Sequence, residues 1–381
     1  MSPPLNQIAS DLRQVGLDIL RRLQPYWLKR AITGDQGIAF QYQDGHAGEF
    51  SARLLSDVML GFLALALVDG CDQAISLTRS ILREVLKKQD PSGAFRWNLP
   101  DPNSSHPLGV RDQVDLAMVL DAYGLLQDAA ILNGEETEAI QRSVVKAIDY
   151  LRTAGLRGRP GIIRKRHYED RCAGLDVLNG DALAAKAYYT ARRMGLGSVE
   201  IEEIRPFLTH LAERFGRHHA GWWVYCESLA DGANFPPDRP GYSLFFQAMT
   251  LVHLRPLVED PHFSEFGDTA EQAMASVISA SFSNGRLDER FESRPELHGK
   301  PNALVATCLA LSGEAEAERK ALARLEFIRR YLITDTGDVR DERGHPVSDV
   351  WRIWLFSDVA RYVLDFVLRP TASAQSLCAA I

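Results

Sequence analysis

Short segments that combine arginines, aromatic rings and carboxylates recur along this sequence, and such side chains could bind and process an acidic ligand. Four of the six tryptophans lie in these segments: Trp97, Trp222, Trp223 and Trp351. Arginine forks bind carboxylates through two parallel hydrogen bonds, and flat rings stack on the apolar faces of sugar rings. The set is therefore typical of an acidic-saccharide site, although any single arginine could instead pair with a neighbouring Asp or Glu.

The residues that this pattern predicts to bind such a substrate are spread over five segments of the chain. They are Trp97, Arg111, Arg166, Asn179, Trp223, Arg290, His298, Asn302, Trp351 and Arg352. An acidic saccharide is accordingly the partner that the sequence predicts.

Two kinds of catalytic residue are expected in the same segments. Tyr168 and Tyr242 are candidates for a base and an acid that move a proton next to a carboxylate, because a nearby arginine can lower the pKa of a tyrosine. Asp112, Glu227 and Asp288 are candidates for the paired carboxylates of glycoside hydrolysis. Each of these carboxylates could instead cap a helix or join an ion pair.

A mixed metal site is the other chemistry to weigh. Cys172, Cys226 and His298 lie in three successive segments, and zinc tolerates such a ligand set. Their spacing matches no specific zinc motif, and a buried thiol is the commoner role for a lone cysteine. We therefore expect no metal and no cofactor.

A repeat of roughly sixty residues must position these segments. In each copy a glycine is followed by a short alternation of apolar and polar residues, as in "PSGAFRWN". The six glycines are Gly37, Gly93, Gly161, Gly221, Gly285 and Gly337. Such a glycine permits the turn that ends one helix before a short strand begins.

Each copy of the repeat contains two helical patterns. Helices with one charged face are expected before the glycines, over residues 8–30, 74–88, 137–152, 201–214, 269–281 and 315–331. More apolar helices are expected after them, over 50–68, 110–126, 175–193, 242–257, 302–311 and 347–368. The first kind belongs on the outside of a fold and the second inside.

This alternation predicts an all-α (α/α)6 toroid, with six helical hairpins and short β-strands at one end. Residues 1–369 would form this single domain and 370–381 a C-terminal tail. The alternative is an open solenoid, whose repeats are usually shorter, about 34 to 47 residues. Both folds would place the chemistry on loops and helix starts.

Composition narrows the classes of function. The 381 residues carry a net charge of −7, which argues against a nucleic-acid binder. Five scattered cysteines, without a CxxC pair, favour a reducing compartment. Residues 58–68 form an apolar run that is too short to span a membrane, and the N-terminus lacks a secretory pattern. We expect a cytoplasmic protein without a membrane span, and a homodimer is compatible with the sequence.

Two longer segments resemble a known family. "YEDRCAGLDVLNGDALAAKAYY" (168–189) and "PGYSLFFQAMTLVHLRPLVEDPHFSEFGDTAEQA" (240–273) resemble successive parts of the C-terminal toroid of D-glucuronyl C5-epimerases and related (α/α)-barrel sugar epimerases. The resemblance covers at most about a quarter of the chain. It implies that Tyr168, Asn179 and Tyr242 handle a uronate, whereas Ser243 and Phe246 replace two histidines of the family pattern.

Three functional hypotheses follow. The first is an enzyme that acts on an acidic saccharide by epimerisation, lyase or hydrolase chemistry. The second is a terpenoid cyclase or prenyltransferase-like enzyme, because "QDPSGAFRW" resembles the repeat of those families. The DxDD acid motif of type II cyclases is absent, and Asp112 and Asp115 are a poor substitute for it. The third is a saccharide-binding protein without catalysis. A wide mouth lined by arginine and carboxylate would favour the sugar, and deeply buried aromatic residues with few charges in the cavity would favour the terpenoid.

Overall fold

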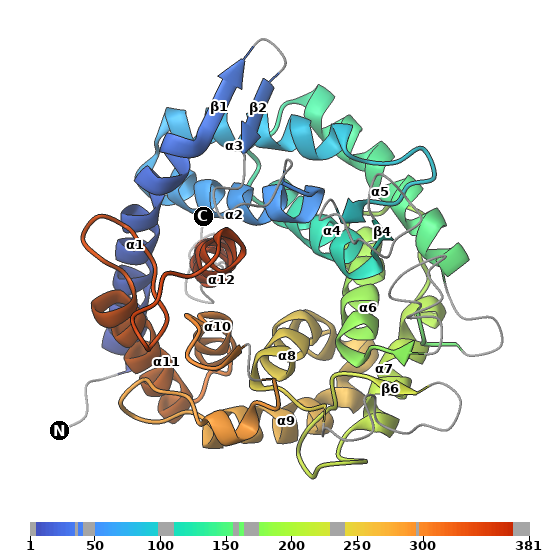
Figure 1. Cartoon of the computed structure of the whole chain (residues 1–381). Coiled ribbons are helices and arrows are strands. Elements are labelled where there is room, and N and C mark those ends of the chain that lie inside the picture. Colours follow the sequence, from blue (N-terminus) through green and yellow to red (C-terminus); the bar gives the residue numbers. More distant parts are fainter. Residues whose placement is uncertain are drawn as a thin grey trace, which may run out of the picture.

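Twelve α-helices of the described residues alternate between an outer and an inner ring (Figure 1). The computed structural model describes residues 5–34, 37–40, 50–97, 110–154, 160–163, 175–228, 241–294 and 297–368. The outer helices are α1 (Leu5–Arg30), α3 (Asp72–Lys87), α5 (Gly134–Ala154), α7 (Ile201–Arg214), α9 (Gly267–Ser279) and α11 (Ala315–Phe327). The inner helices are α2 (Ala52–Asp69), α4 (Gln113–Asp128), α6 (Leu178–Arg193), α8 (Leu244–Val258), α10 (Leu304–Ala310) and α12 (Asp349–Leu368).

The distribution of apolar residues explains which helix lies inside. In α2 every residue from Ala52 to Ala66 is buried, so this helix is surrounded by protein. In α3 the buried residues recur at helical spacing, as Ala74, Thr78, Ile81 and Val85 do, and they form a single face. A helix with one apolar face packs against a core, whereas a helix that is apolar all round lies within it.

The inner ring is closed. Each inner helix contacts the next one along the chain, and the last, α12, contacts both α10 and the first, α2. In the outer layer α1 contacts α11 and α12. The predicted (α/α)6 toroid is therefore confirmed, and an open solenoid is not formed.

The repeated glycines set the distance between neighbouring outer helices. Gly93 follows α3 with φ +95°, and a Cβ at this position would lie 2.1 Å from the carbonyl oxygen of Lys146 on α5. Gly285 follows α9 and meets the carbonyl oxygen of Ala323 on α11 in the same way, at 2.2 Å. Gly161 and Gly337 repeat the arrangement against Pro206 on α7 and Arg22 on α1. A side chain at these positions would push apart two helix backbones, which is why glycine recurs there.

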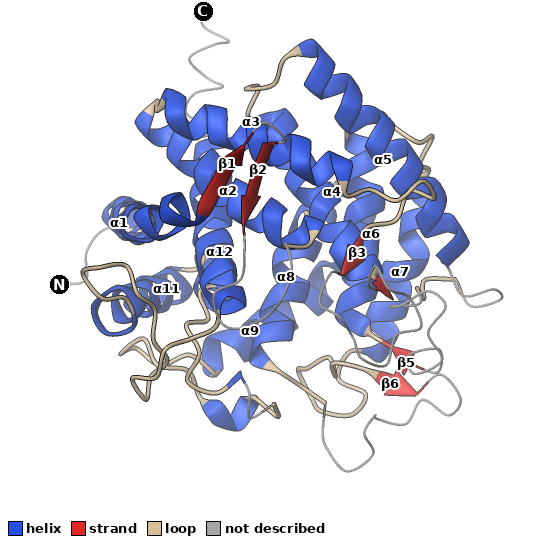
Figure 2. Ribbon diagram, turned by 45° about the horizontal axis from the view of Figure 1, so that its top comes forward, coloured by secondary structure: helices blue, strands red, loops and turns tan. Residues whose placement is uncertain are grey.

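Short antiparallel strand pairs lie on the connections that lead from outer to inner helices (Figure 2). They are β1 (Ala31–Gly34) with β2 (Gly37–Phe40), β3 (Arg96–Trp97) with β4 (Val110–Arg111), and β5 (Leu175–Asp176) with β6 (Glu227–Ser228). Isolated bridges, such as Ser281 with Leu287, occupy the later connections. The predicted strands are thus present, and α4 and α6 begin later than expected because β4 and β5 precede them.

The inner helices all begin at the end of the ring that carries these connections, which we call the mouth. The helix N-termini there expose backbone N–H groups and favour negative charge. Among the described residues, no helix is sufficiently long and apolar to cross a membrane.

Candidate active site

Several inner helices begin at the mouth with a side-chain cap. The Ser51 hydroxyl accepts a hydrogen bond from the backbone N–H of Leu54 at the start of α2. At the start of α4, Asp112 Oδ1 accepts from the N–H of Val114 at 2.9 Å. The predicted catalytic Asp112 therefore caps a helix, which was the alternative weighed for it.

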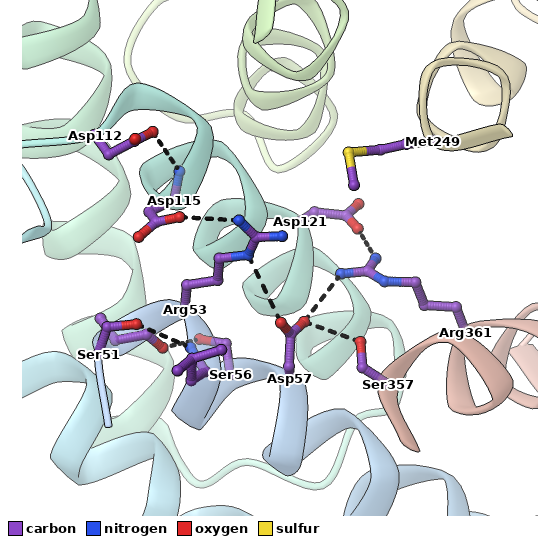
Figure 3. Close-up of polar contacts among 12 residues, drawn as sticks. Ser51, Arg53, Ser56, Asp57, Asp112, Asp115, Asp121, Met249, Ser357 and Arg361 are labelled. Carbon is purple, nitrogen blue, oxygen red and sulfur yellow. Dashed lines mark hydrogen bonds and ion pairs between the residues drawn. The ribbon is translucent and has the colours of Figure 1, made fainter. Parts of the chain in front are cut away.

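A network of buried ion pairs joins three inner helices inside the ring (Figure 3). Arg53 of α2 donates from Nη1 to Asp115 Oδ1 of α4 at 3.1 Å, and its Nε lies 3.8 Å from Asp57 Oδ2. Arg361 of α12 donates to Asp121 of α4. Arg361 Nη2 also lies 3.9 Å from Asp57 Oδ1. We call these five residues the interior network; their side chains point toward one another from α2, α4 and α12.

Two further inner helices, α6 and α8, contribute side chains that lie near Asp121 of this network. Lys186 Nζ of α6 lies 3.4 Å from Asp121 Oδ1, and His253 Nδ1 of α8 lies 3.8 Å from Asp121 Oδ2. Burial lowers the pKa of His253 to about 3, so this imidazole is neutral. Burial alone would raise the pKa of Asp121, but Lys186 and Arg361 hold it below its ordinary value. Asp121 is therefore an ionised carboxylate inside the ring, in contact with side chains from three other inner helices.

Aromatic rings form a wall at the mouth next to this network. The ring of Phe245 on α8 lies 5.7 Å from that of Trp354 and 6.0 Å from that of Trp351, both on α12. The guanidinium of Arg53 lies 5.4 Å from the Trp354 ring. Both tryptophans are partly exposed. We call Phe245, Trp351 and Trp354 the aromatic wall; it combines flat apolar faces with an adjacent cation.

Glu292 is the carboxyl group of the mouth whose acidity is most useful for catalysis. The Ser243 hydroxyl donates to its Oε2 at 2.5 Å, and the backbone N–H of Arg294 donates to its Oε1 at 3.1 Å. Burial raises the pKa of Glu292 to about 7 despite these hydrogen bonds. A carboxyl group with this pKa can either give or take a proton at neutral pH.

Glu292 lies beside the aromatic wall. The N–H of Phe245 forms a backbone hydrogen bond with its carboxylate. Glu292 also lines a small cavity of about 30 Å³, which has room for water. This cavity is also lined by three residues that the sequence predicted for the site: Asp288, His298 and Asn302.

The predicted catalytic carboxylates Glu227 and Asp288 each form an ion pair with an arginine of the protein. Glu227 of β6 is buried and lies 3.2 Å from Arg214 Nη1 and 2.9 Å from His218 Nε2. Asp288 accepts from Nε and Nη2 of Arg290, and its oxygen lies 2.6 Å from Nη2. Glu227 and Asp288 are therefore each engaged in an ion pair, which is the alternative role expected for these carboxylates.

Tyr242, the predicted acid, lies at the mouth among other rings. Its ring is 4.6 Å from that of His219 and 6.0 Å from that of Trp222. Arg352 of the predicted binding set donates to the Tyr26 hydroxyl at 2.6 Å and to Asp349 Oδ1 at 3.0 Å. Tyr242 and Arg352 thus have defined protein partners at the mouth.

Other predicted binding residues occupy different environments. Asn179 on α6 is buried, and its Nδ2 donates to the sulfur of Met249, which points into the ring. Trp223 is buried in the core and donates from Nε1 to the Leu211 carbonyl at 2.8 Å. Asn302 Oδ1 accepts from the N–H of Val305 near the start of α10. Of these three, Asn179 is the one that contacts another inner helix, through Met249 of α8.

Four predicted residues have side chains outside the described part of the chain. The backbones of Trp97 and Arg111 lie in β3 and β4, where Arg111 pairs with Arg96. Arg166 and Tyr168 lie outside the described residues altogether, as does Cys172. Their roles remain predictions.

Of the interior network, the sequence pattern singled out only Asp115, because that pattern concerns the starts of the inner helices. A signal for other members is nevertheless present: Asp57, Asp121 and Arg361 are charged residues within otherwise apolar helices. An isolated charge in a buried helix needs a partner on another buried helix. Glu292 was one acidic residue among several in its segment, and nothing in the sequence distinguishes its burial.

A larger surface pocket of about 400 Å³ lies at the C-terminal end of α6, and neither the aromatic wall nor Glu292 lines it. Its arginines are engaged: Arg193 bonds Asp128 at 2.7 Å, and Arg192 bonds the Val199 carbonyl at 3.1 Å. We therefore place the candidate active site at the mouth.

No protein-family model matches the chain, and no curated protein is similar to it in sequence. Its structure is similar to that of cellobiose 2-epimerase from Bacillus thermoamylovorans, with a TM-score of 0.64 and 11% identity over 95% of this chain and 99% of that one. The chain has the (α/α)6-toroid fold. The predicted likeness to toroid carbohydrate enzymes is thus confirmed for the fold.

Two further similar structures represent both enzymatic hypotheses. An unsaturated glucuronyl hydrolase specific for heparin has a TM-score of 0.63 and 10% identity over 93% of this chain and 97% of that one. The type II terpene cyclase MstE from Scytonema has a TM-score of 0.58 and 14% identity over 96% and 99%. At such identities the likeness concerns the fold, so the side chains must decide between the hypotheses.

Proposed function

We propose that this toroid is a carbohydrate-active enzyme that binds an acidic, uronate-containing saccharide at its mouth. The observation that carries the proposal is the aromatic wall, with Arg53 over Trp354 on one side and the half-buried Glu292 on the other. Rings of this kind stack on sugar faces, and Arg53, which Asp57 and Asp115 hold in place, adds positive charge beside them.

The chemistry we propose is proton transfer at a uronate. Epimerisation and elimination both begin when a base removes the proton next to the carboxylate, while a cation stabilises the negative charge that develops. Epimerisation then returns a proton to the opposite face, whereas elimination expels the neighbouring glycosidic oxygen. Glu292 joins Tyr168 and Tyr242 as a candidate for the group that moves the proton, and Asn179 is a candidate for positioning the substrate.

Binding is tested first, with a uronate oligosaccharide and a neutral oligosaccharide of equal length. Arg352→Gln should weaken binding of the acidic ligand by ~1.5–3 kcal/mol and leave the neutral one unchanged. Trp351→Ala should weaken both ligands, because stacking does not depend on charge. Arg142→Gln, on the outside of α5, is the control. Equal losses for both ligands in Arg352→Gln would refute a carboxylate contact.

Turnover is tested by incubating the protein with uronate polymers in deuterated water. We expect deuterium at C5 of the uronate or an unsaturated product that absorbs in the ultraviolet. Tyr168→Phe should suppress the signal at least ~10²-fold if this tyrosine is the base. Release of reducing ends without either signal would replace the proposal by hydrolysis. Binding without any turnover would leave a saccharide-binding protein.

A terpenoid cyclase is the second candidate, because an aromatic wall can also stabilise a carbocation. The ion pairs of Asp57, Asp121 and Arg361 inside the ring count against it, since an apolar prenyl chain would have to lie against them. Cyclisation of a linear polyprenyl substrate by the purified protein, together with no response to uronates, would reverse this preference.

A further inference from the structure

Three ligand-type side chains converge below the mouth, behind the inner ring. Asp176 belongs to β5, Asp181 to the first turn of α6, and His210 to the outer helix α7. His210 Nε2 lies 2.7 Å from Asp176 Oδ2 and 3.9 Å from Asp181 Oδ2. Among the described residues, this is the one group of three such side chains whose ligand atoms lie close enough to hold one ion, all within 4.8 Å of one another.

Two oxygens of these facing carboxyl groups lack a hydrogen-bond donor among the residues that the structure describes, unless the groups share a proton, which would join Asp181 to Asp176. Asp181 is fully buried; its Oδ1 accepts from the N–H of Ile163 at 2.8 Å, but its Oδ2 has no hydrogen-bond partner in the described part of the chain. Asp176 is 2% exposed, and its Oδ1 likewise accepts no hydrogen bond from the described residues. Two buried carboxylates that face each other require a proton or a cation between them.

Arg214 lies close enough to influence Asp176, but it pairs with another carboxylate. Arg214, one turn beyond His210 on α7, lies 3.2 Å from the buried Glu227, which pairs with Asp176 across β5 and β6. His218 also contacts Glu227, at 2.9 Å. With Arg214 paired to Glu227, His210 is the basic group that contacts the Asp176 and Asp181 pair.

We propose that Asp176, Asp181 and His210 bind a divalent transition-metal ion, with zinc or manganese as the chemical class. One imidazole nitrogen and two carboxylate oxygens are a donor set that both ions accept. In a tetrahedral zinc site, ligand atoms about 2.1 Å from the ion are about 3.4 Å apart, so small side-chain rotations suffice. The ion would clamp outer helix α7 to inner helix α6 and to the β5–β6 pair. The inference is independent of the proposed function.

The test uses the full chain after dialysis against a chelator, with zinc chloride and manganese chloride as separate probes. Calorimetric titration should give one equivalent of bound metal, and the metal should raise Tm by several degrees because it binds only the folded chain. Asp181→Asn and His210→Ala should abolish both effects. Asp181→Asn is nearly isosteric and can retain the contact with Ile163, so its folding is expected to survive. His218→Ala, a nearby histidine that contacts a single carboxylate, should bind metal normally.

Two outcomes would overturn the proposal. The first is that neither metal binds the wild-type chain stoichiometrically or changes its Tm. The second is that Asp181→Asn binds as much metal as the wild type, which would show that the ion sits elsewhere. An unchanged Tm of the chelated Asp181→Asn variant, without metal binding by the wild type, would instead identify a proton as the bridge between the carboxyl groups, because the amide can donate in its place.

Discussion

Replacing Glu292 by glutamine should reveal a stability cost that the wild-type protein carries above neutral pH. Burial raises the pKa of this carboxyl group from 4.5 to about 7. Between these values the folded protein holds a proton that the unfolded chain has released. The free energy of unfolding of the wild type must therefore fall as pH rises through this window. The amide of the Glu292→Gln variant is neutral at every pH, so the variant lacks this slope.

The size of the effect follows from the two pKa values. A shift of this extent corresponds to about 3 kcal/mol in full, of which about 2 kcal/mol develops between pH 5.5 and pH 8.5. Urea unfolding of the wild type and of Glu292→Gln at several pH values measures it directly. Glu271→Gln, an exposed glutamate on α9, is the matched control and should follow the wild type. Parallel profiles for the wild type and Glu292→Gln would refute the argument. An opposite slope would mean that the folded state stabilises the ionised carboxylate.

Two further predictions concern the ring itself. Gly93→Ala should cost at least ~3 kcal/mol of unfolding free energy, because its Cβ would strike the Lys146 carbonyl, whereas Gly195→Ala, with φ +69° and open space around it, should cost only ~1 kcal/mol. Similar losses for both would show that backbone conformation, not helix spacing, selects these glycines. Asp121→Asn should destabilise the protein by ~3–5 kcal/mol by leaving buried cations unpaired, and Asp128→Asn, which breaks the partly exposed pair with Arg193, by at most ~1 kcal/mol. Both series are measured by chemical denaturation, and a small effect of Asp121→Asn would show that the interior network is open to water.

The helices could be predicted because their signals are local. α7 has the bounds that the sequence predicted, and the glycine repeat marked the connections. The start of α4 was placed too early because Val110 and Arg111 form a strand only through pairing with Arg96 and Trp97. Such pairing depends on a partner segment that periodicity does not reveal.

The site was harder to predict because its contacts join distant parts of the chain. Trp222 and Trp223 are neighbours in sequence, but nothing local shows that Trp223 would turn into the core toward Leu211. Asp57 is held by Ser357 and Arg361, which become its neighbours only when the ring closes. Residue types alone predicted that the mouth is charged and aromatic. Which charged residue pairs with which could not be predicted, because the partners come together only in the folded chain.

The ring closes where the last inner helix, α12, packs against the first, α2, and these two helices are far apart in the sequence. Ser357 donates to Asp57 across a separation of 300 residues. During synthesis α2 leaves the ribosome long before α12 is made, a delay of about 15 to 60 s at ~5–20 residues per second. For this time the apolar surface of α2 that α12 will cover lacks its partner. Until its last inner helix emerges, a newly made chain therefore stays monomeric only if aggregation is slow or if chaperones cover this surface.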